Sequence, residues 1–126
     1  MLSGKNFSLV DRIRSFKYAF NGIVVLLHSQ HNARIHALAT VISCAAGLYL
    51  GITKTEWCFV IFAICIVWIA EALNTALEFM CDEMSPDYNK IIGEAKDVAA
   101  AAVLIASIGA AVIGLIIFMP YVIKLL

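Results

Sequence analysis

The chain has 126 residues, of which 63% are hydrophobic, and its mean hydropathy is +0.93. These values exclude an ordinary soluble domain and indicate an integral membrane protein that forms a single domain over residues 1–126. The formal net charge is zero, so the overall charge predicts no nucleic-acid partner. The four cysteines lie in apolar segments without a C-x-x-C pair, and we interpret them as free, packed thiols.

The first predicted element is an amphipathic helix over residues 8–29, after residues 1–6, which we expect to be loose. Ser8 is suited to cap its first turn, with Asp11 three residues further on. One face is apolar, and the opposite face carries Arg14, Lys17 and His28. This pattern is typical of a helix lying in the membrane interface, although the same face could pack on the protein's own bundle.

Three apolar segments follow, and we expect them to span the membrane over residues 34–52, 57–80 and 98–118. A polar bridge, residues 29–36, leads into the first span, and a tight turn at residues 53–56 separates it from the second. A polar loop over residues 82–97 precedes the third span, which Met119-Pro120 should end. The predicted fold class is therefore all-α integral membrane, with three transmembrane helices plus an N-terminal amphipathic surface helix.

Basic residues are distributed unequally between the two predicted sides. Most of them precede the first span or lie in the second loop: Arg12, Arg14, Lys17, Arg34, Lys90 and Lys96. The opposite side carries Lys54 and Lys124. The positive-inside rule therefore predicts a cytoplasmic N-terminus and a cytoplasmic second loop.

A polar stripe interrupts the second span. Its members fall within an arc of roughly 100° on the helix: Glu71, Asn74, Thr75, Glu78 and Asp82. Glu71 lies ~21 Å along the helix from Trp57, about two thirds of the way across a ~30 Å hydrocarbon core. Lipid cannot satisfy such groups, so an ionisable residue at this depth is a functional hypothesis by default.

Each candidate has a structural alternative. Glu78 with Asp82 could hold a hard cation such as Mg²⁺, or could be a solvated helix end. Glu71 could act as a general base, or could form a hydrogen bond between helices. Asp97, beside Lys96, could simply cap the third span. His28, His31 and His36 lack the spacing of a metal site on one face.

Several stretches, in order and over nearly the whole chain, resemble the prokaryotic diacylglycerol kinase and undecaprenol kinase family. They are Phe16-Lys-Tyr18-Ala-Phe-Asn-Gly22, Asn32-Ala-Arg34-Ile-His36, Glu71-Ala-Leu-Asn74-Thr75-Ala-Leu-Glu78 and Ala95-Lys96-Asp97-Val-Ala-Ala-Ala-Ala-Val-Leu104. The last stretch and the ending Gly114-Leu-Ile-Ile-Phe118 look more like the undecaprenol kinase branch.

The resemblance implies a small homotrimer in the bacterial cytoplasmic (inner) membrane. It also implies transfer of the γ-phosphoryl group of ATP, with Mg²⁺ or Mn²⁺, to the hydroxyl of diacylglycerol or undecaprenol at the cytoplasmic face. The implied partners are the membrane lipid, ATP and further copies of the chain, with no nucleic acid.

The resemblance also assigns roles to residues of this sequence. It implies that Glu71 is the general base, that Asn74 supports it and that Glu78 binds the metal. The implied ATP-binding residues are Arg12, Tyr18, Asp87, Tyr88, Asn89, Lys96 and Asp97. Asn32 and Arg34, with Glu71, would line the lipid site.

One position departs from the family pattern, which usually has a metal-binding Glu two residues before Asn32. This chain has Gln30 there. An amide offers one oxygen and no charge, so this second metal contact should be weakened.

Two other functions remain open from the residues alone. One is a non-enzymatic membrane assembly or lipid-sensing module, and the other is a small cation- or proton-coupled transporter that uses Glu71 as a relay. A transporter has no need for Lys96-Asp97 beside a polar loop that contains a tyrosine, and a packing device has no need for two glutamates. The chain also lacks the inverted repeats common in transporters. An ATP-dependent lipid kinase is therefore the favoured hypothesis.

Overall fold

The computed structural model describes residues 6–126, and within that range every regular element is a helix. The expectation that residues 1–6 are loose falls almost entirely outside the described residues. The four helices are α1 (Leu9–Ser29), α2 (His31–Leu50), α3 (Lys54–Met84) and α4 (Lys90–Leu125). Ser8 caps α1 as the sequence predicts, because its hydroxyl oxygen accepts a hydrogen bond from the Asp11 amide at 3.3 Å.

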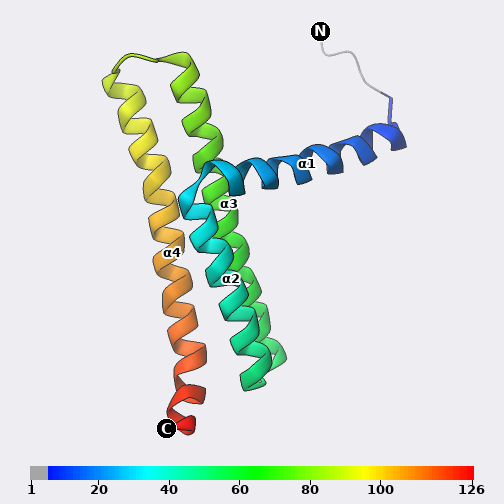
Figure 1. The fold of residues 1–126 in the computed structure, drawn as a ribbon, viewed down its shortest axis with the longest axis vertical. Coiled ribbons are helices and arrows are strands. Elements are labelled where there is room, and N and C mark those ends of the chain that lie inside the picture. Colours follow the sequence, from blue (N-terminus) through cyan, green and yellow to red (C-terminus); the bar gives the residue numbers. More distant parts are fainter. Residues whose placement is uncertain (1–5) are drawn as a thin grey trace.

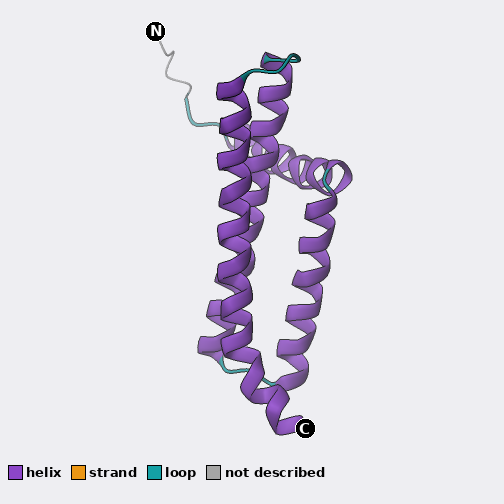
Figure 2. Cartoon of the chain, turned by 90° about the vertical axis from the view of Figure 1, so that its left-hand side faces the viewer, coloured by secondary structure: helices purple, strands orange, loops and turns teal. Residues whose placement is uncertain are grey.

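The helices α2, α3 and α4 are each long and apolar enough to cross a membrane, which confirms the prediction of a membrane protein. They form an elongated bundle in which α3 and α4 pack along most of their length, while α2 contacts mainly α3 (Figures 1 and 2). The helix α1 leaves this bundle crosswise, so its first half projects free of the other helices (Figure 1).

A single extended residue, Gln30, separates α1 from α2, so residues 31–36 of the expected polar bridge form the first turns of α2. The side chain of Arg34 explains the tight junction. Its guanidinium donates to the carbonyl oxygens of Leu27 and His28, each at 3.0 Å. The last carbonyls of α1 therefore have a partner, and α2 begins at once.

The turn from α2 to α3 depends on two glycines. Gly51 ends α2 with φ of 65°, in the left-handed region that glycine adopts without steric cost. A Cβ on Gly47 would lie 2.7 Å from the Trp57 ring, so only glycine allows this approach. Thr53 and Glu56 then form a reciprocal capping box that starts α3.

The loop between α3 and α4 is residues 85–89, much shorter than the predicted loop of residues 82–97. Asn89 caps α4 by accepting hydrogen bonds from the amides of Ile91 and Ile92. The sequence misled here because Asp82, Glu83 and residues 90–97 are polar. They belong to helical turns that continue beyond the apolar segments, so Asp97 is not a helix cap.

The last helix also continues past Pro120 to Leu125, whereas Met119-Pro120 was expected to end the third span. Proline removes one backbone donor, and other contacts hold the turns that follow. The Tyr121 hydroxyl donates to Glu56 at 2.6 Å, and Ile52, Val60 and Ile117 form an apolar cluster nearby. This end of the bundle is thereby tied together.

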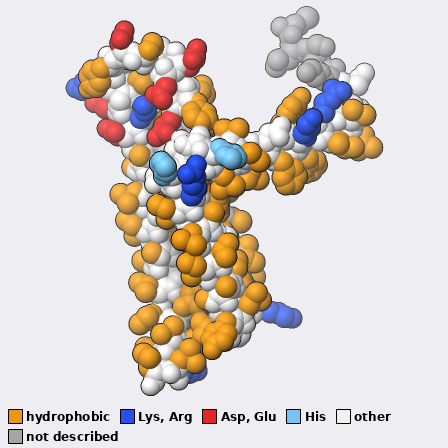
Figure 3. All heavy atoms as spheres, viewed as in Figure 1, with side chains coloured by type: hydrophobic (Ala, Val, Ile, Leu, Met, Phe, Trp, Pro, Cys, Tyr) orange, Lys and Arg blue, Asp and Glu red, His pale blue; other side chains and the backbone are white. Residues whose placement is uncertain are grey.

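The two ends of the bundle differ in charge. Figure 3 shows a shaft covered by hydrophobic side chains, with acidic side chains gathered around the α3–α4 loop. The α1–α2 junction beside it carries histidine and arginine side chains (Figure 3). The polar chemistry of the chain is therefore concentrated at the end of the bundle that α1 joins.

Candidate active site on α3

Glu71 is the largest fully buried side chain of residues 6–126, with 1% of its surface exposed. It lies on the face of α3 that turns toward α2. Neither carboxylate oxygen has a hydrogen-bond partner among the described residues. Burying a carboxyl group without a hydrogen bond is costly, so this position is a candidate for a functional role.

The next turn of α3 adds two buried polar groups. Asn74 and Thr75 are 7% and 4% exposed, and the Asn74 side-chain carbonyl and the Thr75 hydroxyl have no hydrogen-bond partner within residues 6–126. With Glu71 they form a patch of unsatisfied polar atoms inside an apolar span. Such a patch suits a hydroxylated or otherwise polar ligand that enters the site.

The stripe then opens toward the α3–α4 loop. Glu78 lies seven residues beyond Glu71, or about 10 Å along the helix, and is half-buried. One turn further, the exposed Asp82 accepts a hydrogen bond from the Lys96 ammonium at 2.7 Å. The hydrogen bond and charge of Asp82 raise the pKa of Lys96, and the charge of Glu78 adds to this shift. The structure thus brings a buried carboxylate, a half-buried carboxylate and a lysine together in that order along α3 and the start of α4.

The residues at the α1–α2 junction lie around the same end. Gln30 is half-buried and its side chain makes no capping hydrogen bond, while Asn32 is exposed. The Arg34 guanidinium donates hydrogen bonds to carbonyl oxygens of α1, a role in the fold that the sequence did not reveal.

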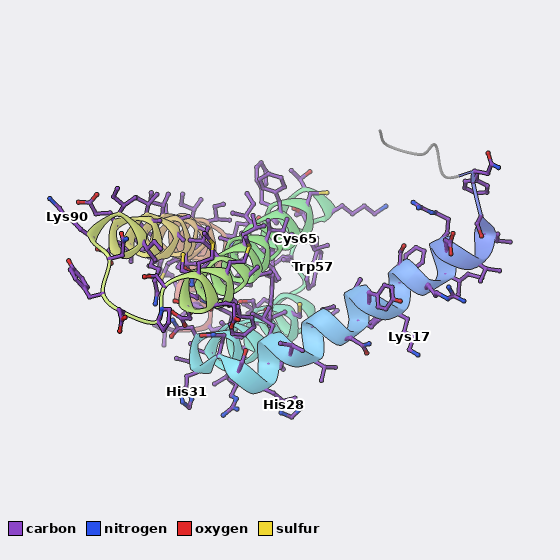
Figure 4. The ribbon with its side chains drawn as sticks, turned by 90° about the horizontal axis from the view of Figure 1, so that it is seen from above. Lys17, His28, His31, Trp57, Cys65 and Lys90 are labelled. Atoms are coloured by element: carbon purple, nitrogen blue, oxygen red, sulfur yellow. The ribbon has the colours of Figure 1, made fainter. Side chains whose placement is uncertain are left out.

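Other residues of the implied ATP site lie apart from this group in a single chain. Arg12 and Tyr18 lie on the half of α1 that projects from the bundle, and Asp87, Tyr88 and Asn89 lie exposed in the α3–α4 loop. Asp97 is exposed on α4, one residue after Lys96. Figure 4 shows the separation: Lys17 on α1 and Lys90 at the loop lie on opposite sides of the molecule.

Sequence reasoning missed His36. Its Nε2 atom lies 3.4 Å from the Glu71 Oε2 atom, although the pair is not aligned as a hydrogen bond. Periodicity within one helix cannot show a contact between two helices. A signal did exist, because His36 lies 17 residues before the turn at residues 53–56 and Glu71 lies 15 residues after it, which places them at similar height on antiparallel helices.

An apolar cavity of about 390 Å³ adjoins this pair, between α2, α3 and α4. His36 and Trp68 line the end nearer to Glu71, and Phe118 lines the other end. Thr40, Ser43 and Ser107 are its polar wall residues besides His36. A long apolar chain could occupy such a space with its polar end near Glu71.

The residues present fit a divalent cation that is shared with a phosphorylated ligand. Within residues 6–126 there is no group of three or more His, Cys, Asp or Glu side chains placed to hold a metal by themselves. Mg²⁺ is commonly held by one or two carboxylates, with substrate phosphates and water completing its shell. Glu78, whose carboxylate makes no ion pair in the described residues, can supply such a ligand.

The fold and the site together define a class: an integral membrane protein with three candidate spans and a carboxyl side chain buried in the second. Comparison with known proteins narrows this class. The family model described as prokaryotic diacylglycerol kinase matches residues 17–118.

Individual relatives agree with that match. The chain is 34% identical over 113 residues to a diacylglycerol kinase of Synechocystis, covering 89% of this chain and 65% of that protein. It is 31% identical over 107 residues to an undecaprenol kinase of Bacillus subtilis, covering 85% of this chain and 87% of that protein. A diacylglycerol kinase of Escherichia coli is 28% identical over 100 residues, covering 79% of this chain and 82% of that protein.

The chain therefore belongs to the prokaryotic diacylglycerol kinase family, a family of lipid kinases.

Proposed function

We propose that this protein transfers the γ-phosphoryl group of MgATP to the hydroxyl of a membrane lipid alcohol, either diacylglycerol or undecaprenol. The names of the relatives given above include both of these lipid alcohols. In the proposed reaction the lipid oxygen bonds to the γ-phosphorus, the bond to the ADP oxygen breaks, and the hydroxyl proton passes to a base. The active site would face the cytoplasm, where ATP is available, as the distribution of basic residues predicts.

The observation that carries this proposal is the Glu71 carboxylate, which is 1% exposed and has no hydrogen-bond partner within residues 6–126. A carboxylate in this state can accept a proton from an entering hydroxyl group. The unsatisfied side chains of Asn74 and Thr75 lie within about one turn and can position that hydroxyl. The adjoining apolar cavity offers room for the lipid chain.

The other half of the reaction needs positive charge near the phosphates. Phosphoryl transfer depends mainly on positioning and on neutralising the phosphate oxygens. Lys96 can contact those oxygens, and Asp82 holds its ammonium at that position. Glu78 would hold the Mg²⁺ ion, which supplies charge neutralisation at the β- and γ-phosphates.

We further propose that the protein works as a homotrimer in which α1 serves a neighbouring copy. Arg12 and Tyr18 lie on the projecting half of α1, where most side chains are exposed, including large apolar ones such as Phe16 and Phe20. Exposed apolar side chains on a free helix need a partner, which can be lipid or protein. A second copy of the chain would bring Arg12 and Tyr18 to a site that one chain leaves incomplete.

The direct test of the activity is a phosphorylation assay in mixed micelles with labelled ATP and a panel of lipid alcohols. We expect label in diacylglycerol or undecaprenol, dependent on Mg²⁺ or Mn²⁺, and a rate lower by roughly 10²-fold or more with the Glu71→Gln variant. Absence of labelled lipid from the whole panel would contradict the proposal and favour the sensor or transporter alternatives.

The sharing of sites between copies has its own test. Arg12→Ala and Glu71→Gln variants are purified separately, mixed and reassembled. If α1 serves a neighbour, the mixture recovers activity that neither parent has, because some sites receive Arg12 and Glu71 from different copies. Recovery of no activity would place both residues in the same copy's site.

A further inference from the structure

His36 connects the proposed base to the rest of the fold. It lies in the second turn of α2, with 15% of its side chain exposed and its Nε2 atom buried. That nitrogen lies 3.4 Å from Glu71 Oε2 and has no hydrogen-bond partner within residues 6–126. His36 also lines the cavity between α2, α3 and α4. It therefore borders the apolar space and lies beside the buried carboxylate.

The orientation of the imidazole ring is fixed from α3. The edge of the ring meets Trp68 in a T-shaped arrangement, with centroids 6.4 Å apart and planes at 68°. The Trp68 indole N–H donates to the Thr40 hydroxyl oxygen at 3.0 Å, and that hydroxyl donates to the His36 carbonyl oxygen at 2.7 Å. Trp68 thus contacts the ring of His36 directly and is linked to its backbone carbonyl through Thr40, and this packing favours the ring position beside Glu71.

Glu71 needs such an external support. A glutamate side chain has three rotatable bonds, and neither carboxylate oxygen is held by a hydrogen bond from the described residues. A general base must keep one oxygen directed at the proton that it accepts. Hydrogen bonds at catalytic groups are often long without substrate and shorten when substrate binds, so a separation of 3.4 Å suits this role.

Resting on the proposed kinase function, we propose that His36 is a positioning residue whose Nε2–H donates to Glu71 Oε2 and leaves Oε1 free to accept the lipid hydroxyl proton. The proton from the lipid oxygen ends on Glu71 Oε1 as the oxygen bonds to the γ-phosphorus and ADP leaves. His36 keeps its own proton throughout this step. A histidine that orients a buried carboxylate reverses the usual arrangement, in which a carboxylate orients a histidine.

The test compares three substitutions at one position in the full chain, assayed in lipid micelles with ATP and Mg²⁺. His36→Gln keeps an N–H donor about as far from the backbone as Nε2. His36→Asn carries the same amide one carbon shorter, and His36→Leu removes the donor. We expect His36→Gln to retain most of the kcat and the other two to lose about tenfold or more, with KM for lipid and for MgATP little changed. Cys44→Ala is the matched control, because Cys44 lies on α2 but does not line the cavity, and it should keep the wild-type kcat.

The outcomes separate this inference from the proposed function. An active wild type with an inactive Glu71→Gln variant, together with a fully active His36→Leu variant, overturns the inference alone. Equal losses in His36→Gln and His36→Asn also overturn it, as does a loss confined to KM, because a donor at the Nε2 position would then have no special effect. If none of the three variants folds, as judged by helical circular dichroism, His36 is a structural residue and the inference is overturned. A wild type without kinase activity overturns the proposed function and this inference together.

Discussion

Two glutamates on α3 have opposite surroundings. Glu56, in the first turn, accepts hydrogen bonds from the Thr53 amide at 2.9 Å and the Tyr121 hydroxyl at 2.6 Å. Glu71, fifteen residues later on the same helix, is fully buried and accepts no hydrogen bond from any described residue. The first carboxylate ties the start of α3 to the end of α4. The second lies 3.4 Å from the His36 Nε2 atom on α2, without a hydrogen bond.

This difference indicates that the two ends of the bundle have different roles, one in stability and one in chemistry. A carboxylate with its partners in place stabilises the fold and has little capacity left for chemistry. A buried carboxylate without partners costs stability and is available to an incoming group. The end with Glu56 therefore holds the helices together, and the end with Glu71 carries the reaction that we propose.

The largest expected difference between the two glutamates appears when each carboxylate is replaced by an amide. Glu71→Gln should lower kcat by roughly 10²- to 10⁴-fold, the usual contribution of a general base. Glu56→Gln should leave kcat near the wild-type value. Initial rates of lipid phosphorylation measure both, and circular dichroism verifies the fold. If Glu71→Gln kept more than about a tenth of the wild-type rate, Glu71 would not be the base.

A second test concerns the charged residues nearer to the α3–α4 loop and their effect on MgATP binding. Glu78→Ala and Lys96→Ala should each raise the KM for MgATP by about tenfold, because each removes a charged group that faces the phosphates. Lys90→Ala is the matched control, since Lys90 is exposed and pairs with Glu94 only at 4.0 Å. Unchanged KM values in the two site variants would move the nucleotide site away from the stripe.

Gln30 offers a way to add charge at the polar end. Gln30→Glu should lower the Mg²⁺ concentration needed for half-maximal rate by several-fold, because a carboxylate binds a hard cation more strongly than an amide does. A Mg²⁺ titration of both forms measures the change. Identical curves would show that position 30 is not a metal contact, and a nearly inactive wild type rescued by the substitution would mark Gln30 as an inactivating residue.

The smallest effects concern stability and should have opposite signs at the two ends. Tyr121→Phe removes a partner of Glu56 and should lower the melting temperature by a few degrees, with activity unchanged. Glu71→Leu replaces a buried carboxyl group that has no hydrogen bond by an apolar group and should raise the melting temperature while it abolishes turnover. Thermal unfolding in detergent measures both, and a decrease for Glu71→Leu would show that Glu71 supports the fold.

Hydrophobic periodicity and capping rules predicted much of the fold, because the apolar segments, the Ser8 cap and the inward polar stripe are local features of the chain. The same rules misplaced the second loop, because they treat a polar stretch as a loop. In the structure, α3 and α4 continue into that stretch as polar helical turns. The end at Pro120 was wrong because a contact between helices, from Tyr121 to Glu56, holds the turn that proline weakens. The pairing of His36 with Glu71 and the use of Arg34 as a cap are also contacts between helices, and a single sequence has no periodic signal for them.

The α1–α2 junction sets the handedness of the proposed assembly. One residue, Gln30, joins the two helices, and the Arg34 guanidinium bonds two carbonyls of α1 from the first turns of α2. The direction in which α1 leaves the bundle is therefore fixed within each chain before any copy meets another. In a closed ring of such chains every α1 helix must point the same way around the axis. Each copy can therefore reach its neighbour on one side only. Substituting Arg34 would free the direction of α1 relative to α2, so that α1 could contact either neighbour. The resulting assemblies would include open or mispaired rings beside the correct ones.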